Sequence, residues 1–361
     1  MWMNDVIVWI VVFFAIVGAL DRIAGNRFGY GESFERGFMA MGPVALAMIG
    51  VISFSPVLAD LLRPFITPLF QAMGADPAVF AGMLFAIDMG GYPLSVDLAE
   101  STEVGLFSGI ILATMVGPVF VFTIPVALGI IDKADHPLFA KGILIGLIPV
   151  PIGAYIAGLV AGFSPTLLIV NLIPVVLFSL IIAIGLLVWP GHFIKGFIGF
   201  GKVIIAFLTL TGAVVIFETL TGSVLVPGTA PFVDAIEIVG LIAITLAGAF
   251  PLVHFLRTAF QRVIEPAAIR LGIKQVSIVG LLSSLAHSIP MFQVLNEMDE
   301  RGKVINVAFA VSGAFVLGGH LGFTASVEPE MITAMMSGKL TAGILACAIA
   351  FFTVKTIKYR G

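Results

Sequence analysis

The sequence predicts an all-α polytopic membrane protein with about nine transmembrane helices plus two re-entrant helical hairpins, arranged as two inverted repeats. Three observations lead to this fold class. Hydrophobic residues make up 60% of the 361 residues and charged residues only 11%, whereas soluble domains carry about 25% charge. Most apolar runs are continuous, but two are interrupted at their middle. Glycines and prolines recur at a constant offset between the two halves.

The apolar runs give the transmembrane helices directly, because a helix needs about 20 residues to cross the hydrocarbon core. Long continuous runs exclude a β-barrel, whose strands alternate apolar and polar residues. The first residues carry no positive charge, so the first run is interpreted as a transmembrane helix and not as a cleavable signal. The runs fall near residues 5–20, 38–60, 104–131, 138–162, 166–189, 197–217, 233–256, 304–326 and 338–357.

Two further apolar segments, 77–99 and 275–297, each contain a polar or proline-containing break. The first break covers residues 88–93 and the second residues 287–290. Each arm has about ten residues, or about 15 Å of helix, which is half a bilayer. This length predicts re-entrant hairpins. The alternative is two kinked full spans, which would give eleven spans in total.

The distribution of lysine and arginine favours the hairpins. With eleven full spans and an external N-terminus, eight of these residues are cytoplasmic and ten are external. With two hairpins, only Arg63 and Lys339 remain outside, and the cytoplasmic group includes Lys355, Lys358 and Arg360. The positive-inside rule therefore selects the hairpin topology, with the N-terminus outside and the C-terminus in the cytoplasm.

An internal repeat supports the same arrangement. At an offset of 198 residues, the matching pairs are Gly42 and Gly240, Gly50 and Gly248, Pro68 and Pro266, Gly74 and Gly272, and Gly82 and Gly280. The single domain, 1–361, divides into repeat 1 (1–162, with hairpin 77–99), a linking helix (163–197) and repeat 2 (198–361, with hairpin 275–297). Inverted repeats with broken helices are typical of secondary transporters.

Asp88 is the main candidate for a binding residue, because a carboxylate at membrane depth is unfavourable unless it serves a function. It precedes Gly90 and Gly91, which allow backbone carbonyls to approach a ligand. Tyr92 follows and offers an aromatic face to a cation. These residues predict a site for a small cation at the tip of the first hairpin. A helix cap is the alternative role for Asp88.

Polar residues elsewhere on the hairpins and spans complete the predicted site. Further candidates for substrate binding are Ser95 on the first hairpin and His287, Ser288, Gln293 and Asn296 on the second. His287 and Ser288, near the break, would face Asp88 if the tips meet. Candidates for gating or proton coupling are Asp97, Thr123, Glu297 and His320. Thr123 and His320 lie near breaks in the spans that follow the hairpins. A structural role remains the alternative for Asp97 and His287.

Other function classes lack their sequence signatures. The chain contains no phosphate-binding loop and no nucleophile elbow, and its single cysteine, Cys347, allows neither an intrachain disulfide nor a zinc motif. The net charge of −3, without a basic face, argues against nucleic acid as a partner. We therefore expect no enzyme activity, no cofactor and no metal. A membrane-embedded enzyme or receptor is the least favoured alternative.

Several long motifs resemble those of a known family. They are Glu35-Arg36-Gly37-Phe38-Met39-Ala40-Met41-Gly42, Phe80-Ala81-Gly82, Asp88-Met89-Gly90-Gly91, Ser108-Gly109-Ile110-Ile111-Leu112, Met115-Val116-Gly117-Pro118, Ile124-Pro125-Val126-Ala127-Leu128-Gly129-Ile130-Ile131, Ile289-Pro290-Met291-Phe292, Arg301-Gly302-Lys303-Val304-Ile305-Asn306 and His320-Leu321-Gly322-Phe323. On these motifs, nearly the whole chain resembles the ethanolamine permease of ethanolamine-utilisation systems, the EutH family. It departs from the family at His287-Ser288, where an amide pair is frequent, and at Gly319, where an aspartate often precedes the histidine.

The resemblance implies uptake of ethanolamine across the bacterial cytoplasmic membrane by a secondary permease or facilitator, to feed an ammonia-lyase pathway. Ethanolamine is mostly a cation at neutral pH, which suits an intramembrane carboxylate such as Asp88. A channel-like path for small amines, or transport of another small cation, is the alternative, and the sequence leaves proton coupling, sodium coupling and passive transport open. Expected partners are ethanolamine, membrane lipid and further copies of the chain in a homo-oligomer.

Overall fold

A computed structural model describes residues 2–354, without the side chains of residues 190, 194 and 263. All regular elements in this part are helical. Eight helices are long and apolar enough to cross a membrane: Trp2–Ile23, Tyr30–Gln71, Thr102–Ile130, Lys133–Val160, Pro165–Val188, Gly191–Thr221, Phe232–Arg262 and Pro329–Thr353. The predicted all-helical, multi-pass class is therefore confirmed. Lys355, Lys358 and Arg360, which entered the charge argument, lie outside the described residues.

The first half of the chain begins with long helices and continues with short ones. In chain order they are α1 (Trp2–Ile23), α2 (Tyr30–Met39), α3 (Met41–Gln71), α4 (Ala78–Leu84), the single turn η1 (Ile87–Met89), α5 (Gly91–Leu98), α6 (Thr102–Leu106), the π-helix η2 (Phe107–Leu112), α7 (Ala113–Met115), the π-helix η3 (Val119–Thr123), α8 (Ile124–Ile130), η4 (Lys133–Asp135), α9 (His136–Leu147), α10 (Val150–Val160) and α11 (Pro165–Val188).

The second half follows a similar order. Its elements are α12 (Pro190–Thr221), α13 (Phe232–Leu271), α14 (Gln275–Ser284), α15 (Ile289–Gln293), η5 (Leu295–Glu297), α16 (Glu300–Ser312), α17 (Gly319–Val327), η6 (Pro329–Met331) and α18 (Ile332–Thr353). The predicted span 304–326 is thus two helices, α16 and α17, separated at residues 313–318.

Both long helices that precede the short helix pairs end at a glycine with positive φ. Gly74 follows α3 with φ 72°, and Gly272 follows α13 with φ 62°. Glycine adopts this left-handed conformation without the steric penalty of a Cβ atom, so it terminates the helix and redirects the chain. The two glycines are one of the pairs at the 198-residue offset, so the recurrence in sequence marks a recurrence in backbone geometry.

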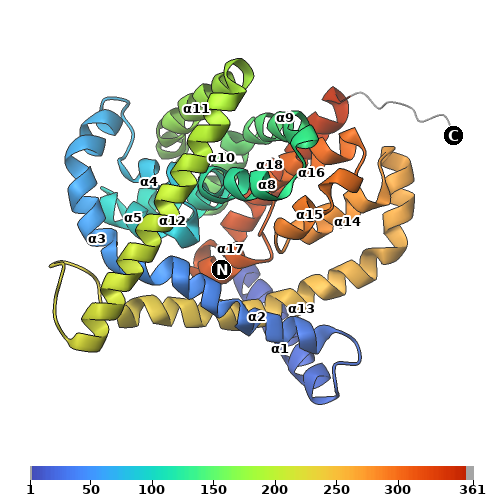
Figure 1. Cartoon of the computed structure of the whole chain (residues 1–361), viewed down its shortest axis with the longest axis horizontal. Coiled ribbons are helices and arrows are strands. Elements are labelled where there is room, and N and C mark those ends of the chain that lie inside the picture. Colours follow the sequence, from blue (N-terminus) through green and yellow to red (C-terminus); the bar gives the residue numbers. More distant parts are fainter. Residues whose placement is uncertain (1, 355–361) are drawn as a thin grey trace.

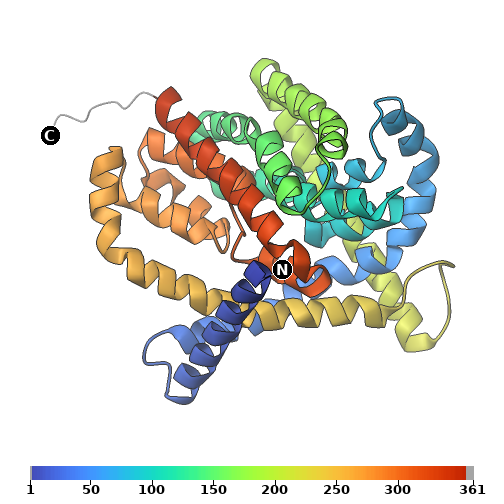
Figure 2. The same ribbon diagram turned by 180° about the vertical axis from the view of Figure 1, so that it is seen from behind.

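The two long helices α3 and α13 flank a central group of helices. In Figure 1, α13 runs along the bottom and bends upward beside α14 and α15, while α3 rises on the opposite side beside α4 and α5. Figure 2 shows the same arrangement from behind, with α18 crossing the central group. In that group α9 packs on α16, and α10 packs on α18.

Burial separates the central helices from those that face lipid. In the span Thr102–Ile130, 83% of the most apolar window is buried inside the protein, against 22% for α1 and for Gly191–Thr221. An apolar helix that is buried on all sides lies in the interior of a bundle, whereas exposed apolar side chains suit contact with lipid. The interrupted helix α6–α8 is therefore the best candidate among these spans to line a binding site inside the protein.

Candidate functional site

Each short helix pair is closed at one end by an aspartate. We define hairpin 1 as α4, η1 and α5, and hairpin 2 as α14, α15 and η5. At hairpin 1, Asp76 accepts hydrogen bonds from the backbone N–H groups of Ala78 at 2.8 Å and Glu100 at 3.0 Å. At hairpin 2, Asp299 accepts from the backbone N–H of Lys274 at 2.8 Å. The first and last residues of each pair are thus adjacent, so the arms run antiparallel and the tip lies at the far end.

Each hairpin tip packs against a glycine of the helix that follows it. We define broken span 1 as α6 to α8 and broken span 2 as α16 and α17. A Cβ added at Gly117 would lie 1.9 Å from the Phe85 carbonyl oxygen, and one at Gly318 would lie 2.0 Å from the Ala286 carbonyl oxygen. Only glycine permits these approaches. The offset is the same on both sides of the contact, since 318 − 117 and 286 − 85 both equal 201.

The first arms of the hairpins repeat a second contact. A Cβ on Gly82 would lie 2.2 Å from the Ser108 carbonyl oxygen, and one on Gly280 would lie 2.5 Å from Asn306 Oδ1. Both pairs are separated by 198 residues, since 280 − 82 and 306 − 108 both equal 198. The two halves therefore bring equivalent positions of a hairpin arm and a broken span together, through a backbone oxygen in the first half and a side-chain oxygen in the second.

Each hairpin also contacts the broken span of the other half. The η1 turn of hairpin 1 contacts α17, and α15 of hairpin 2 contacts α8. Aromatic pairs mark both crossings, with ring centroids 5.7 Å apart for Tyr92 and Phe323 and 5.8 Å apart for His287 and Phe122. The two hairpin tips and the two broken spans thus form one central region, which we call the tip region.

Phe315 is the centre of an aromatic cluster in the tip region. Its ring centroid lies 4.8 Å from that of His287, 5.0 Å from that of His320 and 5.5 Å from that of Phe122. Its φ of 64° is left-handed, which is unfavourable for a residue with a Cβ atom and is concentrated at functional sites. The backbone N–H of Phe315 donates to the Ser284 carbonyl at 2.9 Å, which holds this conformation against hairpin 2.

Buried polar side chains without a hydrogen-bond partner gather in the same region. Among the described residues, those on hairpin 2 and the broken spans are Ser108, Thr123, Ser284, Ser288, Asn306 at Oδ1, Ser312, His320 at Nδ1 and Thr324. Leaving one such group unpaired costs about 1–3 kcal/mol. Several of them in one region indicate a site for a polar ligand.

Asp88 lies in η1 at the tip of hairpin 1, half-buried, beside α17. Within the described chain its carboxylate forms no hydrogen bond or ion pair with another residue, so His287 is not joined to it. Gly90 has φ 104°, and a Cβ there would lie 2.6 Å from Val51 of α3. Gly91 is equally confined, since its Cβ would lie 2.5 Å from the Phe85 carbonyl oxygen. Both glycines therefore serve the close packing of the tip.

Glu328 is a site residue that the sequence analysis missed. It follows α17, is half-buried and accepts a hydrogen bond from the Tyr92 hydroxyl at 2.9 Å. Glu328 and Glu330 line a cavity of about 390 Å³ beside Trp2 of α1. A carboxylate directly before a proline, at the end of an apolar span, was the available signal.

Several predicted site residues lie away from the tip region. Ser95 donates to the Ala78 carbonyl across hairpin 1 at 3.3 Å, and Asp97 accepts from the Ser55 hydroxyl of α3 at 2.6 Å. Asn296 is exposed and donates to Asp132 at 3.3 Å. Gln293 and Glu297 are also exposed. The structure thus places Asn296 and Glu297 near the base of hairpin 2, whereas Thr123, Ser288 and His320 lie in the tip region.

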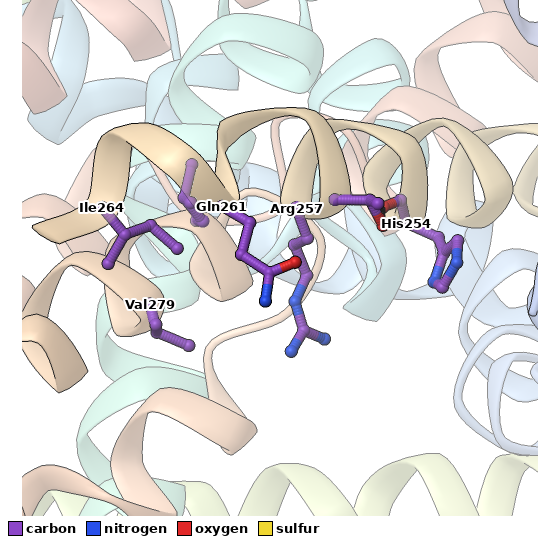
Figure 3. A pocket seen from close by; sticks show the side chains of 7 residues that line it. His254, Arg257, Gln261, Ile264 and Val279 are labelled. Carbon is purple, nitrogen blue, oxygen red and sulfur yellow. Dashed lines mark hydrogen bonds between the residues drawn. The ribbon is translucent and has the colours of Figure 1, made fainter.

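Cavities lie between parts of hairpin 2 and α13, although α14 also packs directly against α13. One, of about 350 Å³, is lined by His254, Arg257, Thr258, Gln261, Ile264, Val279 and Leu282. Figure 3 shows the side chains of Arg257 and Gln261 projecting from α13 into this space. A second cavity, of about 240 Å³, shares His254 and Arg257 and reaches His287 near the hairpin tip. Hairpin 1, in contrast, is held against α3 by the hydrogen bond between Ser55 and Asp97.

Lys339 corrects one step of the charge argument, which placed this residue outside. It lies in α18, is only 1% exposed, and donates from Nζ to the Thr114 carbonyl of α7 at 2.6 Å. Arg63, the other cation placed outside, is exposed. Within the described residues no group of three or more His, Cys, Asp or Glu side chains is arranged to hold a metal ion.

Comparison with known proteins gives matches over nearly the whole chain. Residues 3–353 match the family described as "Ethanolamine utilisation protein, EutH". The chain is 50% identical over 352 residues to "Probable ethanolamine permease EutH" of Listeria monocytogenes, covering 98% of this chain and 94% of the relative. It is 40% identical over 392 aligned positions to "Probable ethanolamine permease EutH" of Escherichia coli, covering 98% and 96%. No solved structure matches the chain.

Proposed function

We propose, from the premise that this chain belongs to the EutH family of ethanolamine utilisation proteins, that it takes up ethanolamine across the bacterial cytoplasmic membrane as a secondary permease or facilitator. Relatives named as ethanolamine permeases and eight helices of membrane-spanning length support a multi-pass transporter. Ethanolamine carries an ammonium group and a hydroxyl group, so its site needs a negative charge, aromatic faces and hydrogen-bonding groups within a few ångströms.

The tip region contains these groups, and their presence together in one region is the main support for the proposal. The unpaired Asp88 carboxylate faces the ammonium group, and the rings of Tyr92 and Phe323 flank it. Thr324 Oγ1 and His320 Nδ1, both buried without a partner on α17, take the hydroxyl group. Because η1 contacts α17, one small molecule can reach both sets of groups.

The hairpins act as gates in this proposal. The repeated glycine contacts at both tips support two structural repeats. We place them in inverted orientation, with hairpin 1 re-entering from outside and hairpin 2 from the cytoplasm. Hairpin 1 rests against α3, while cavities open between hairpin 2 and α13, which supports an inward-facing state. Substrate leaves along His287, and the outward-facing state forms when hairpin 2 closes on α13 and the bond between Ser55 and Asp97 breaks.

The test is uptake of labelled ethanolamine into proteoliposomes that contain the purified full chain. We expect saturable uptake above that of empty liposomes, competed by unlabelled ethanolamine. Imposed proton and sodium gradients then separate a facilitator from a coupled permease, since only coupled transport accumulates substrate beyond equilibrium. A correctly folded protein that gives no uptake above empty liposomes contradicts the proposal, and uptake that never saturates supports a channel-like path instead.

A further inference from the structure

Lys339 is a buried amine that the proposed substrate path does not use. Its Nζ atom donates to the carbonyl oxygen of Thr114, in the middle of broken span 1, at 2.6 Å. The side chain is 1% exposed. Among the described residues it has no carboxylate partner and no other hydrogen-bond acceptor. A lysine in the interior of a membrane protein is unfavourable enough to require a reason.

The reason lies in the break of broken span 1. In an α-helix the carbonyl of Thr114 would accept from the N–H of residue 118, but that residue is Pro118, which has no N–H. A π-helical bond from Val119 is also absent, since the Val119 N–H donates to the Val116 carbonyl at 3.1 Å. The Thr114 carbonyl therefore lacks its α-helical partner, and the Lys339 amine donates to it instead.

A carbonyl freed at the end of a helical segment attracts cations. Helix C-terminal ends carry partial negative charge, and unwound carbonyls at membrane depth coordinate sodium ions or protons in transporters. In this chain the amine of Lys339 already occupies the place beside the Thr114 carbonyl oxygen. At 2.6 Å from the oxygen, Nζ occupies a position from which a cation could otherwise contact this carbonyl.

We propose that Lys339 acts as a tethered substitute for a coupling sodium ion at broken span 1, so that this chain transports its substrate without sodium. The inference deepens the proposed function, because its transport readout relies on ethanolamine uptake. It predicts that shortening the side chain exposes the Thr114 carbonyl and creates a site at which sodium binds.

The first arm measures thermal unfolding of the purified full chain in sodium chloride and in caesium chloride at equal ionic strength. The wild-type melting temperature is expected to be the same in both salts. Lys339→Ala is expected to melt lower in caesium, with a rise of about 2–4 °C in sodium, the shift that binding of modest strength gives a chain of this size. Lys339→Met, which fills the space without a donor, melts lower in both salts and gains nothing from sodium.

The second arm measures ethanolamine uptake in the same two salts. Wild-type uptake is expected to be equal in both, whereas Lys339→Ala loses at least about tenfold in caesium and recovers in part in sodium. Sodium-dependent wild-type uptake, or a Lys339→Ala protein indifferent to sodium in both arms, overturns the inference. If the wild type shows no uptake in any salt, the proposed function fails, and the thermal arm still decides the role of Lys339.

A second variant covers failure of Lys339→Ala to fold. Lys339→Gln is shorter but keeps an N–H donor for the Thr114 carbonyl. Melting temperature and uptake of this variant are expected to be independent of sodium, as in the wild type. Sodium dependence of Lys339→Gln would show that the Lys339 amine excludes a cation only through its charge. This result would contradict the inference that Lys339 replaces sodium by occupying the place beside the Thr114 carbonyl.

Discussion

Phe315 and Asp88 illustrate, at the scale of single residues, what a sequence reveals about a membrane site. Asp88 is visible because a carboxylate between apolar residues has no other explanation than function or capping. Phe315 is one phenylalanine among 31. Its left-handed backbone arises from hydrogen bonds with hairpin 2, a contact between distant segments that no local pattern encodes. Lys339 was misplaced for the same reason, since its partner is a carbonyl 225 residues away.

Phe315 gives a prediction that separates ring packing from backbone strain. Both Phe315→Ala and Phe315→Gly remove a buried ring, so both should destabilise the protein, by about 3–5 kcal/mol for the alanine variant. Glycine adopts a φ of 64° without a Cβ penalty, so Phe315→Gly should be the more stable of the two by about 1 kcal/mol. Thermal unfolding of the two variants measures this difference. An alanine variant as stable as the glycine variant would show that the backbone at this position is unstrained.

The pair of Tyr92 and Glu328 gives a prediction about charge. Glu328→Gln keeps an oxygen that accepts the bond from the Tyr92 hydroxyl but removes the negative charge, whereas Tyr92→Phe removes the bond and leaves the charge. If Glu328 attracts a cationic substrate, Glu328→Gln should raise the KM for ethanolamine several-fold more than Tyr92→Phe does. Its effect should depend only weakly on salt, because a half-buried charge is screened much less than an exposed one. Equal KM values for the two variants would point to a structural bond only.

At the scale of elements, the positions of the two short helix pairs could be predicted, because each apolar segment is interrupted by a break that is polar or contains proline. The helices of hairpin 2 span 275–297, the predicted range, and those of hairpin 1 span 78–98. The arrangement of the tips was not readable, since it depends on Gly117 and Gly318 of the broken spans. A glycine that lies close to a carbonyl of a neighbouring segment cannot be distinguished, from the sequence alone, from a glycine without such a contact.

For Gly117 and Gly318, nearby glycines in the broken spans serve as matched controls, because a Cβ atom added to them would contact nothing. Gly318→Ala should lower stability by about 1–3 kcal/mol and abolish uptake, because its Cβ would lie 2.0 Å from the Ala286 carbonyl oxygen. Gly319→Ala, one residue along, has no atom within 4 Å of its Cβ and should behave as wild type. The same contrast is expected between Gly117→Ala and Gly129→Ala. Melting temperature and uptake of the four variants check it, and a well-folded, active Gly318→Ala would contradict the tip packing.

At the scale of the whole molecule, the two halves share contacts but differ in how their hairpins meet the long helices. Hairpin 1 bonds to α3 through Asp97, whereas cavities lie between hairpin 2 and α13. A sequence predicts the repeat, because both halves carry the same glycines. It does not predict where the cavities lie, because their positions depend on contacts between segments that are distant in the sequence. Carboxylates line the cavity beside α1, whereas arginines line the cavities beside α13, so the two sides of the protein differ in charge.

The open side can be tested by cysteine labelling. In a background in which Cys347 is replaced by serine, Ser283→Cys lines the cavity that reaches His287 and should react with an impermeant maleimide from the cytoplasmic side only. Ser55→Cys, buried between α3 and hairpin 1, should resist labelling from both sides. Oriented membrane vesicles provide the measurement. Labelling of Ser55→Cys from outside, with Ser283→Cys protected, would show that the resting state is outward-facing.

Asp88 is the only carboxylate that the proposal places beside the ammonium group, so the decisive measurement is equilibrium binding of ethanolamine to the purified wild type and Asp88→Asn. Asp234→Asn, at an exposed position at the start of α13, is the matched control. A hydrogen bond to a charged group contributes about 1.5–3 kcal/mol, so Asp88→Asn should bind about 10- to 100-fold more weakly. Asp234→Asn should bind as the wild type does. An Asp88→Asn protein that binds ethanolamine with wild-type affinity would contradict the placement of the ammonium group at the tip of hairpin 1.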